Sequence, residues 1–140
     1  MNVIFTDIDG VLQINNPKKW NKKCCKLYSD ICNELDLKAV ITSTWRVQYK
    51  LRELQEIFYS QGIDVEIVGT TDVLGIERGE EIAMWLSDNM ISNYVVIDDN
   101  VKDILPFVNN VVAIKKSYVG ITEDNINEIR NIVKSGNTKK

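Results

Sequence analysis

The chain opens with a short apolar run that delivers two carboxylates and a glycine at its carboxyl end. The run covers residues 3–6, and Asp7, Asp9 and Gly10 follow it. In a strand, Asp7 and Asp9 point to the same side, because successive side chains alternate between the two faces. Open α/β sheets bind ligands at the carboxyl ends of their strands, where two parallel carboxylates can hold a hard cation or one of them can attack as a nucleophile. This segment therefore predicts a buried strand that ends at a functional site. The alternative is a simple turn, in which the two like charges would repel one another without a cation or a proton between them.

Apolar runs alternate with segments of helical period along the whole chain. The expected strands cover residues 2–6, 38–42, 64–68, 94–97 and 111–114. The expected helices cover residues 20–35, 47–58, 79–89 and 126–133, the last preceded by Thr122 as a helix cap. This order is typical of a parallel sheet with helices on both faces. The sequence therefore predicts an α/β fold: a single Rossmann-like three-layer domain with a mostly parallel five-stranded sheet over residues 1–135, and a polar tail at 136–140.

Composition removes several classes of chemistry. The chain has 140 residues and no histidine, which excludes Ser-His-Asp triads, His-ligated zinc and imidazole acid-base catalysis. Cys24, Cys25 and Cys32 lack paired zinc spacing, so we expect reduced, partly buried thiols. Catalysis would then depend on carboxylates, hydroxyls and cations. Because no apolar run is long enough to suggest a membrane span and the start lacks the order of a signal peptide, we expect a cytoplasmic protein without membrane contact.

Two more polar groups follow predicted strands. Hydroxyl side chains occupy residues 42–44 after the second strand, and Asp98 and Asp99 follow the fourth. Small hydroxyls and free backbone N–H groups at a strand-to-helix turn are suited to phosphate oxygens. Lys102 is the one lysine close to the acid pair in the sequence, and a divalent cation would relieve the crowding of charge. The sequence thus predicts a phosphate and metal site at one edge of the sheet.

In this order, the motifs resemble those of the haloacid dehalogenase (HAD) superfamily of phosphohydrolases. The resemblance rests on the run from Asp7 to Leu12, a Ser or Thr after the second strand, a basic residue before the fourth strand, and Asp98-Asp99. Segments 43–46 and 78–86 are similar to small capless members, including those linked to RNA repair proteins. The resemblance implies a HAD-like domain without a cap domain, with Mg²⁺ as cofactor and a phosphorylated substrate.

The resemblance also implies a role for each acidic residue. Asp7 would be the nucleophile that forms an aspartyl-phosphate, and Asp9 would protonate the leaving group and then activate water. Mg²⁺ would lie between Asp7, the backbone carbonyl of Asp9 and Asp98, with Asp99 or Asp103 acting as a ligand or through water. Because superfamily dehalogenases lack an acid at the position of Asp9, dehalogenation is disfavoured.

The other roles concern phosphate and substrate. Ser43 would bind the phosphoryl oxygens, with Thr42 as the alternative, because a shift of one residue in register exchanges them. The third motif is usually lysine, and Arg78 is the basic residue that best matches its place. Trp45 and Arg46 lie beside the predicted site, where substrate contacts, or a packed tryptophan and a capping arginine, explain them equally well. The candidate substrate contacts are Gly10, Thr44, Trp45, Arg46 and Asp103.

Other functions and several substrates stay open. One alternative is a phosphoacceptor receiver domain, which also has acids at one edge of a sheet, but its acids follow the strands in another order. The other alternative is a HAD fold that has lost catalysis and serves as an interaction module. Loop-sized segments at 13–19 and 69–77 predict an open site that would admit a nucleotide, a nucleic acid end or a phosphoprotein. A lysine cluster near Trp20 would contact a nucleic acid backbone or form a solvated helix face, and the net charge of −3 favours the second interpretation. Its members are Lys18, Lys19, Lys22, Lys23 and Lys26. The sequence makes no prediction of oligomeric state.

Overall fold

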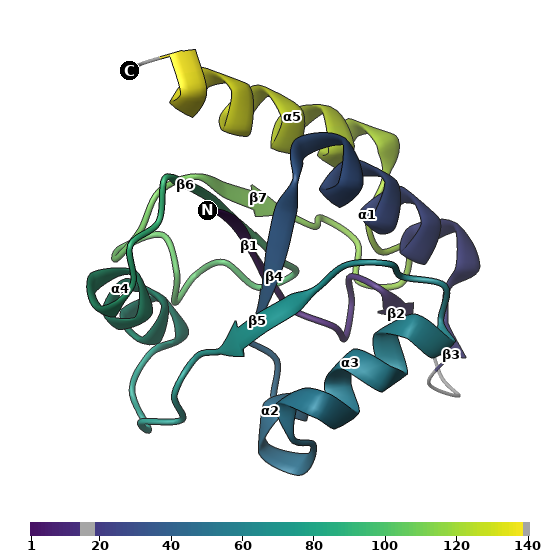
Figure 1. Ribbon diagram of the computed structural model, residues 1–140, viewed down its shortest axis with the longest axis horizontal. Helices are drawn as coiled ribbons and strands as arrows, with labels where there is room; N and C mark the ends of the chain where they lie inside the picture. The colour runs from purple at the N-terminus through teal and green to yellow at the C-terminus, as the bar shows by residue number, and fades with distance from the viewer. Residues whose placement is uncertain (15–18, 139–140) are drawn as a thin grey trace.

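A central five-stranded sheet organises the protein (Figure 1). The computed structural model describes residues 1–14 and 19–138, so Lys18 and the side chain of Lys19 in the predicted lysine cluster lie outside the described part. The strands are β1 (Asn2–Thr6), β4 (Leu37–Ile41), β5 (Ile67–Thr70), β6 (Asn93–Asp98) and β7 (Val111–Ala113). Their order is β5-β4-β1-β6-β7, and every pair is parallel. This confirms the predicted α/β fold with its parallel sheet.

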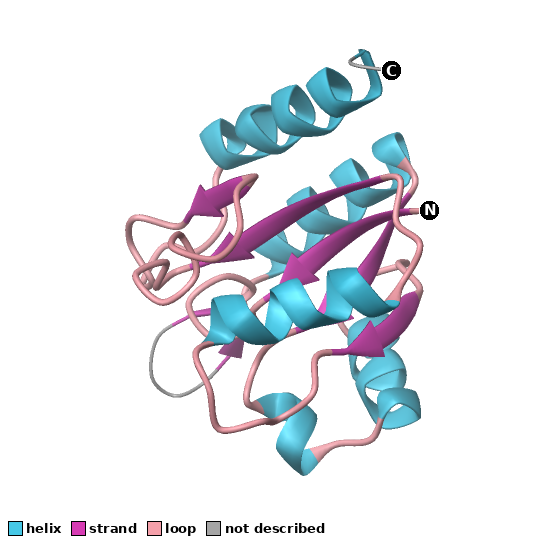
Figure 2. Ribbon diagram, turned by 90° about the vertical axis from the view of Figure 1, so that its left-hand side faces the viewer, coloured by secondary structure: helices cyan, strands magenta, loops and turns pink. Residues whose placement is uncertain are grey.

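Helices cover both faces of the sheet, because the strand side chains alternate between two apolar layers. The helices are α1 (Lys22–Leu35), α2 (Trp45–Gln48), α3 (Leu51–Ser60), α4 (Arg78–Asp88) and α5 (Glu123–Thr138). Ile4 belongs to the larger core, with buried side chains of α1, α3 and α5. Val3 and Phe5 face the other way and pack with Ile82 of α4. The strands in Figure 2 point away from the N-terminus, toward the edge where the loops after β1, β4 and β6 meet.

No cap domain occurs among the described residues at the two places where the sequence left room for one. Between β1 and α1 the chain forms a two-stranded antiparallel ribbon, β2 (Gln13–Ile14) and β3 (Lys19–Trp20). Between β5 and α4 it forms a loop over residues 71–77. Within the described part of the chain, no helix is both long and apolar enough to cross a membrane.

Local side-chain hydrogen bonds move several boundaries from their predicted places. Trp20 lies in β3 rather than in α1, because Asn21 caps the helix by accepting from the backbone N–H of Cys24 at 2.9 Å. The predicted helix over 47–58 is two helices, since Tyr49 and Lys50 are extended and Lys50 begins a new capping box with Glu53.

The third predicted strand is also shifted, from 64–68 to Ile67–Thr70. Asn33 and Ser29 of α1 bind the main chain of Asp64. Gln55 of α3 binds the carbonyl of Val65 and the N–H of Ile67. These side chains take backbone groups that a strand ladder would otherwise use.

The last helix, α5, is longer at both ends than the apolar pattern predicted: it covers Glu123–Thr138 instead of 126–133. Thr122 accepts a hydrogen bond from the backbone N–H of Asn125 at 3.4 Å, which confirms the predicted cap. The helix continues to Thr138, into the segment for which the sequence predicts a polar tail. Cys24, Cys25 and Cys32 are free and buried, in agreement with the expected reduced thiols.

Candidate active site

The carboxyl ends of three adjacent strands bring together side chains that are far apart in the sequence. In the register of the sheet, Thr6 of β1 pairs with Ile41 of β4 and with Ile97 of β6. The next residues along these three strands therefore reach the same level, and they are Asp7, Thr42 and Asp98. Parallel pairing thus converts three sequence motifs into one site.

A pocket of about 300 Å³ opens at this edge. Its lining residues are Asp7, Asp9, Thr44, Arg78, Asp99 and Asn100. The sequence had singled out the first five of these, and it missed Asn100. The backbone N–H of Asn100 donates to Oδ1 of Asp98 at 3.0 Å, so its position directly after the acid pair is the signal that could have identified it.

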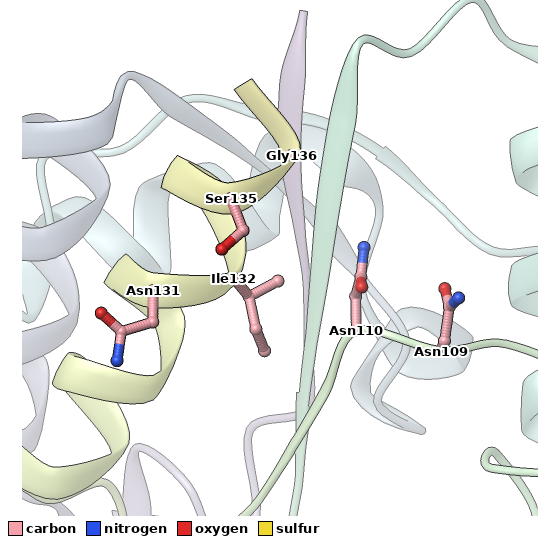
Figure 3. A pocket seen from close by; sticks show the side chains of 6 residues that line it. All are labelled: Asn109, Asn110, Asn131, Ile132, Ser135 and Gly136. Atoms are coloured by element: carbon pink, nitrogen blue, oxygen red, sulfur yellow. The ribbon is translucent and has the colours of Figure 1, made fainter. Parts of the chain in front are cut away.

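A larger pocket, of about 390 Å³, lies between the end of α5 and the turn that precedes β7 (Figure 3). It is lined by Asn109, Asn110, Asn131, Ile132, Ser135 and Gly136. These residues come from the turn before β7 and from the end of α5, and none of them is charged. The larger pocket therefore offers no charged group for catalysis. The smaller pocket is the candidate active site because carboxylates line it.

Three carboxylates in the smaller pocket's neighbourhood are close enough to share one metal ion. Asp7, Asp98 and Asp99 each offer an oxygen, and these oxygens lie within 4.8 Å of one another. Asp98 is fully buried, and Asp7 is 5% exposed. Hard divalent cations prefer such oxygen ligands, so the donor set fits the metal that the sequence implied. The side chain of Asp9 lies outside this group, and its backbone carbonyl remains the ligand that the resemblance implies.

Gly10 allows the acid pair to approach the first motif closely. Its φ of +83° lies in the region that favours glycine, and the Asp99 carboxylate occupies the space where a Cβ would stand. Gly10 therefore contacts a candidate metal ligand, which makes its role in the site steric; its predicted contact with substrate stays a prediction.

Arg78 supplies the positive charge of the site. Its Nη1 lies 2.6 Å from Oδ2 of Asp98 and 3.5 Å from Oδ2 of Asp7. Arg78 reaches these carboxylates from the first turn of α4, and its role as the basic residue of the third motif stays a prediction. Arg78 is twenty residues away from Asp98 along the chain, so the packing of α4 on the sheet brings the two together. Arg78 partly compensates the acid cluster before any metal binds.

Burial leaves the nucleophile candidate with an unusual proton affinity. Burial and the neighbouring carboxylate of Asp98 raise the pKa of Asp7 to about 8, against the opposing effect of Arg78. In metal-free protein the folded state then holds a proton that the unfolded state releases near pH 4. Stability should therefore fall as the pH rises from about 4 to 8.

We expect this fall to disappear in Asp7→Asn, which has no carboxyl group to deprotonate. The slope contributed by Asp7 is at most about 1.4 kcal/mol per pH unit. The measurement is the melting temperature in EDTA from pH 5 to pH 9 for the parent and the variant. Parallel curves would show that Asp7 titrates normally.

The three hydroxyls after β4 occupy different environments. Thr44 lines the pocket. The hydroxyl of Ser43 is buried and accepts the backbone N–H of Trp45 at 3.2 Å. Thr42 is fully buried, and its hydroxyl has no hydrogen-bond partner among the described residues. The choice between Ser43 and Thr42 as the phosphate ligand stays a prediction.

Comparison with known families identifies the chain. It matches, over residues 3–126, the family model described as the HAD domain in Swiss Army Knife RNA repair proteins. The chain belongs to this HAD family. The match includes every motif of the site, and the five-stranded parallel sheet agrees with it. No curated protein and no solved structure matches the chain significantly. The HAD domain supports a phosphatase-like function, with which the buried aspartate cluster is compatible.

Arg46 has a structural place in the HAD domain. Its Nη2 lies 2.9 Å from Oε1 of Glu81 on α4, and both side chains are 6% exposed. The same guanidinium donates to the carbonyls of Thr42, Ser43 and Thr71. All of these contacts are with protein groups, which favours the interpretation of Arg46 as a capping arginine over that of a substrate contact.

Trp45 and Asp103 of the HAD domain also contact protein groups. The indole Nε1 of Trp45 donates to both carboxylate oxygens of Asp9 at 3.3 Å. The backbone carbonyl of Asp103 accepts from the N–H of Gly79 at 2.9 Å, at the start of α4. Gly79 is required there because a Cβ would collide with this main chain. The side chain of Asp103 lies outside the metal-binding group and the pocket lining, and its role as a ligand or through water stays a prediction.

Proposed function

We propose that this HAD domain is a Mg²⁺-dependent phosphomonoesterase that acts through an aspartyl-phosphate on Asp7. The observation that carries the proposal is the convergence of Asp7, Asp9, Arg78 and Asp99 in one pocket, with the buried Asp98 close enough to Asp7 and Asp99 to share a metal ion with them. Each group has a task in phosphoryl transfer. An open pocket without a cap among the described residues leaves room for a large leaving group.

In the first step, a carboxylate oxygen of Asp7 attacks phosphorus while the bond from phosphorus to the leaving oxygen breaks. Asp9 donates a proton to that leaving oxygen. In the second step, Asp9 accepts a proton from a water molecule that attacks phosphorus, which releases phosphate and restores Asp7.

Positive charge is needed throughout both steps because the transferred phosphoryl group is anionic. Arg78 lies within 3.5 Å of Asp7 and would stabilise the charge on the phosphoryl oxygens. A divalent cation held by Asp7, Asp98 and Asp99 would neutralise further charge and keep Asp7 ionised at neutral pH.

For the substrate, we propose a phosphorylated end of a polynucleotide. The support is the description of the matched family, which places such HAD domains in RNA repair proteins, together with the open pocket. Of the predicted lysine cluster, Lys22, Lys23 and Lys26 are exposed on α1, and Lys26 pairs with Asp30 at 3.1 Å.

A substrate panel tests both parts of the proposal. Purified protein with Mg²⁺ is assayed for phosphate release from 4-nitrophenyl phosphate, nucleotides, sugar phosphates, a phosphopeptide and oligonucleotides that carry a 3′ or 5′ phosphate. We expect turnover that EDTA abolishes and Mg²⁺ restores, with kcat/KM highest for an oligonucleotide end. Turnover that persists in EDTA would contradict the metal requirement. Equal kcat/KM for an oligonucleotide and its terminal mononucleotide would exclude the polymer as the preferred substrate.

A further inference from the structure

We propose that Trp45 is a positioning residue that holds the carboxylate of Asp9 for proton transfer. The inference rests on the proposed function and adds a residue to it. Its starting point is the indole N–H of Trp45, which lies 3.3 Å from each carboxylate oxygen of Asp9. A donor shared between both oxygens fixes the direction of a carboxyl group as well as its distance.

Asp9 depends on this donor, whereas Asp7 and Asp98 have other partners. Oδ1 of Asp7 accepts the backbone N–H of Ile8 at 3.0 Å, and Asp98 binds Arg78 and the N–H of Asn100. For the Asp9 carboxylate, the indole is the one hydrogen-bond donor recorded in the described part of the chain. Asp9 is also only partly buried, so packing alone leaves its side chain free to turn.

Trp45 is itself held in place from several sides. Its ring packs edge-on against Trp20, with centroids 5.4 Å apart, and lies 5.5 Å from the ring of Tyr49. Its backbone N–H binds the hydroxyl of Ser43. These contacts fix the position of the indole N–H, which can therefore restrict the rotation of the Asp9 carboxylate.

The position of Asp9 matters most when the leaving group needs a proton. A misplacement of about 1 Å can reduce a rate by about 100-fold. An alkyl phosphate must receive a proton on its leaving oxygen, whereas 4-nitrophenolate leaves readily as an anion. Because kcat/KM reports formation of the aspartyl-phosphate, the loss of positioning should affect these two substrates differently.

The kinetic test compares Trp45→Phe, which keeps an aromatic ring but removes the N–H, with Trp85→Phe. Trp85 packs against Phe5 on the other face of the sheet and serves as the matched control. We expect Trp45→Phe to lower kcat/KM about 10- to 100-fold for an alkyl phosphate and less than about 3-fold for 4-nitrophenyl phosphate. Trp85→Phe should show no such selectivity. In an Asp9→Asn background, Trp45→Phe should cause little further loss.

A spectroscopic test addresses the hydrogen bond without activity. In ¹⁵N-labelled protein, the indole N–H resonance of Trp45 is identified by its absence in Trp45→Phe. We expect this resonance to move in Asp9→Asn, while that of Trp85 stays in place. An unmoved Trp45 resonance would overturn the inference.

The kinetic outcomes separate this inference from the proposed function. Equal losses of kcat/KM for both substrates, or no loss for either, would make Trp45 a packing residue and leave the proposed function standing. If the parent protein hydrolyses neither phosphate ester with Mg²⁺ present, the proposed function fails, and the role of Trp45 in proton transfer fails with it.

Discussion

Replacing Asp7 by asparagine should reduce the proposed phosphatase activity by about 10⁴-fold or more, which is the range seen when a catalytic nucleophile is removed. The amide cannot attack phosphorus, and it removes one negative ligand from the acid cluster. The fold should be unaffected, because the side-chain oxygen of asparagine can still accept the backbone N–H of Ile8. In metal-free protein the melting temperature should be equal or higher, since a buried carboxyl group with a raised pKa is gone.

The matched control for this change is Asp88→Asn at the exposed end of α4. It removes the same charge from a position outside the pocket, and its activity should equal that of the parent. Trapping with BeF₃⁻ and Mg²⁺ provides a structural measurement, in which the adduct should form on Asp7. Full activity of Asp7→Asn, or an adduct on another carboxylate, would contradict the assignment of the nucleophile.

Replacing Glu81 by alanine should destabilise the protein by about 3–5 kcal/mol, or roughly 10–17 °C in melting temperature. The change leaves the guanidinium of Arg46 buried without its ion-pair partner. It also removes the oxygen that accepts the backbone N–H of Leu74 at 2.9 Å. Because Arg46 holds the carbonyls of Thr42 and Ser43, the turn after β4 should loosen as well.

A surface ion pair provides the comparison for Glu81. Lys26 and Asp30 on α1 lie 3.1 Å apart with side chains 78% and 64% exposed, so Asp30→Ala should cost at most about 0.5 kcal/mol. Denaturant unfolding of both variants measures the difference. A cost for Glu81→Ala as small as that for Asp30→Ala would show that the buried pair contributes little.

Much of the fold could be predicted from sequence because apolar runs and their polar ends are local signals. The run before Asp7 is apolar over a length that suits a strand, and the acids at its end mark where the strand leaves the core. Two of the boundaries that failed depend on local caps, at Asn21 and Lys50, and the third predicted strand depends on partners 10 to 35 residues away. Asp64 and Val65 leave the predicted third strand because side chains from α1 and α3 bind their backbone groups.

The residues of the candidate site also differ in how far the sequence could predict them. The sequence identified Asp7, Asp9 and the Asp98-Asp99 pair, because two acids after an apolar strand are a pattern that can be read locally. The pairing of Arg78 with Asp98 could not be read from local pattern, since it joins residues twenty positions apart through the packing of α4 on the sheet.

The two residues after Thr44 show what only tertiary structure could decide. Sequence left open whether Trp45 and Arg46 face a substrate or the protein, because both side chains suit either role. Arg46 faces the protein because Glu81 reaches it from α4, and Trp45 faces Asp9 because Trp20 and Tyr49 hold its ring. By itself the sequence determined the type of fold and the acids of the site, because alternation and strand ends are local properties. The direction of each polar side chain was decided by folding, because it depends on which distant partner completes its hydrogen bonds.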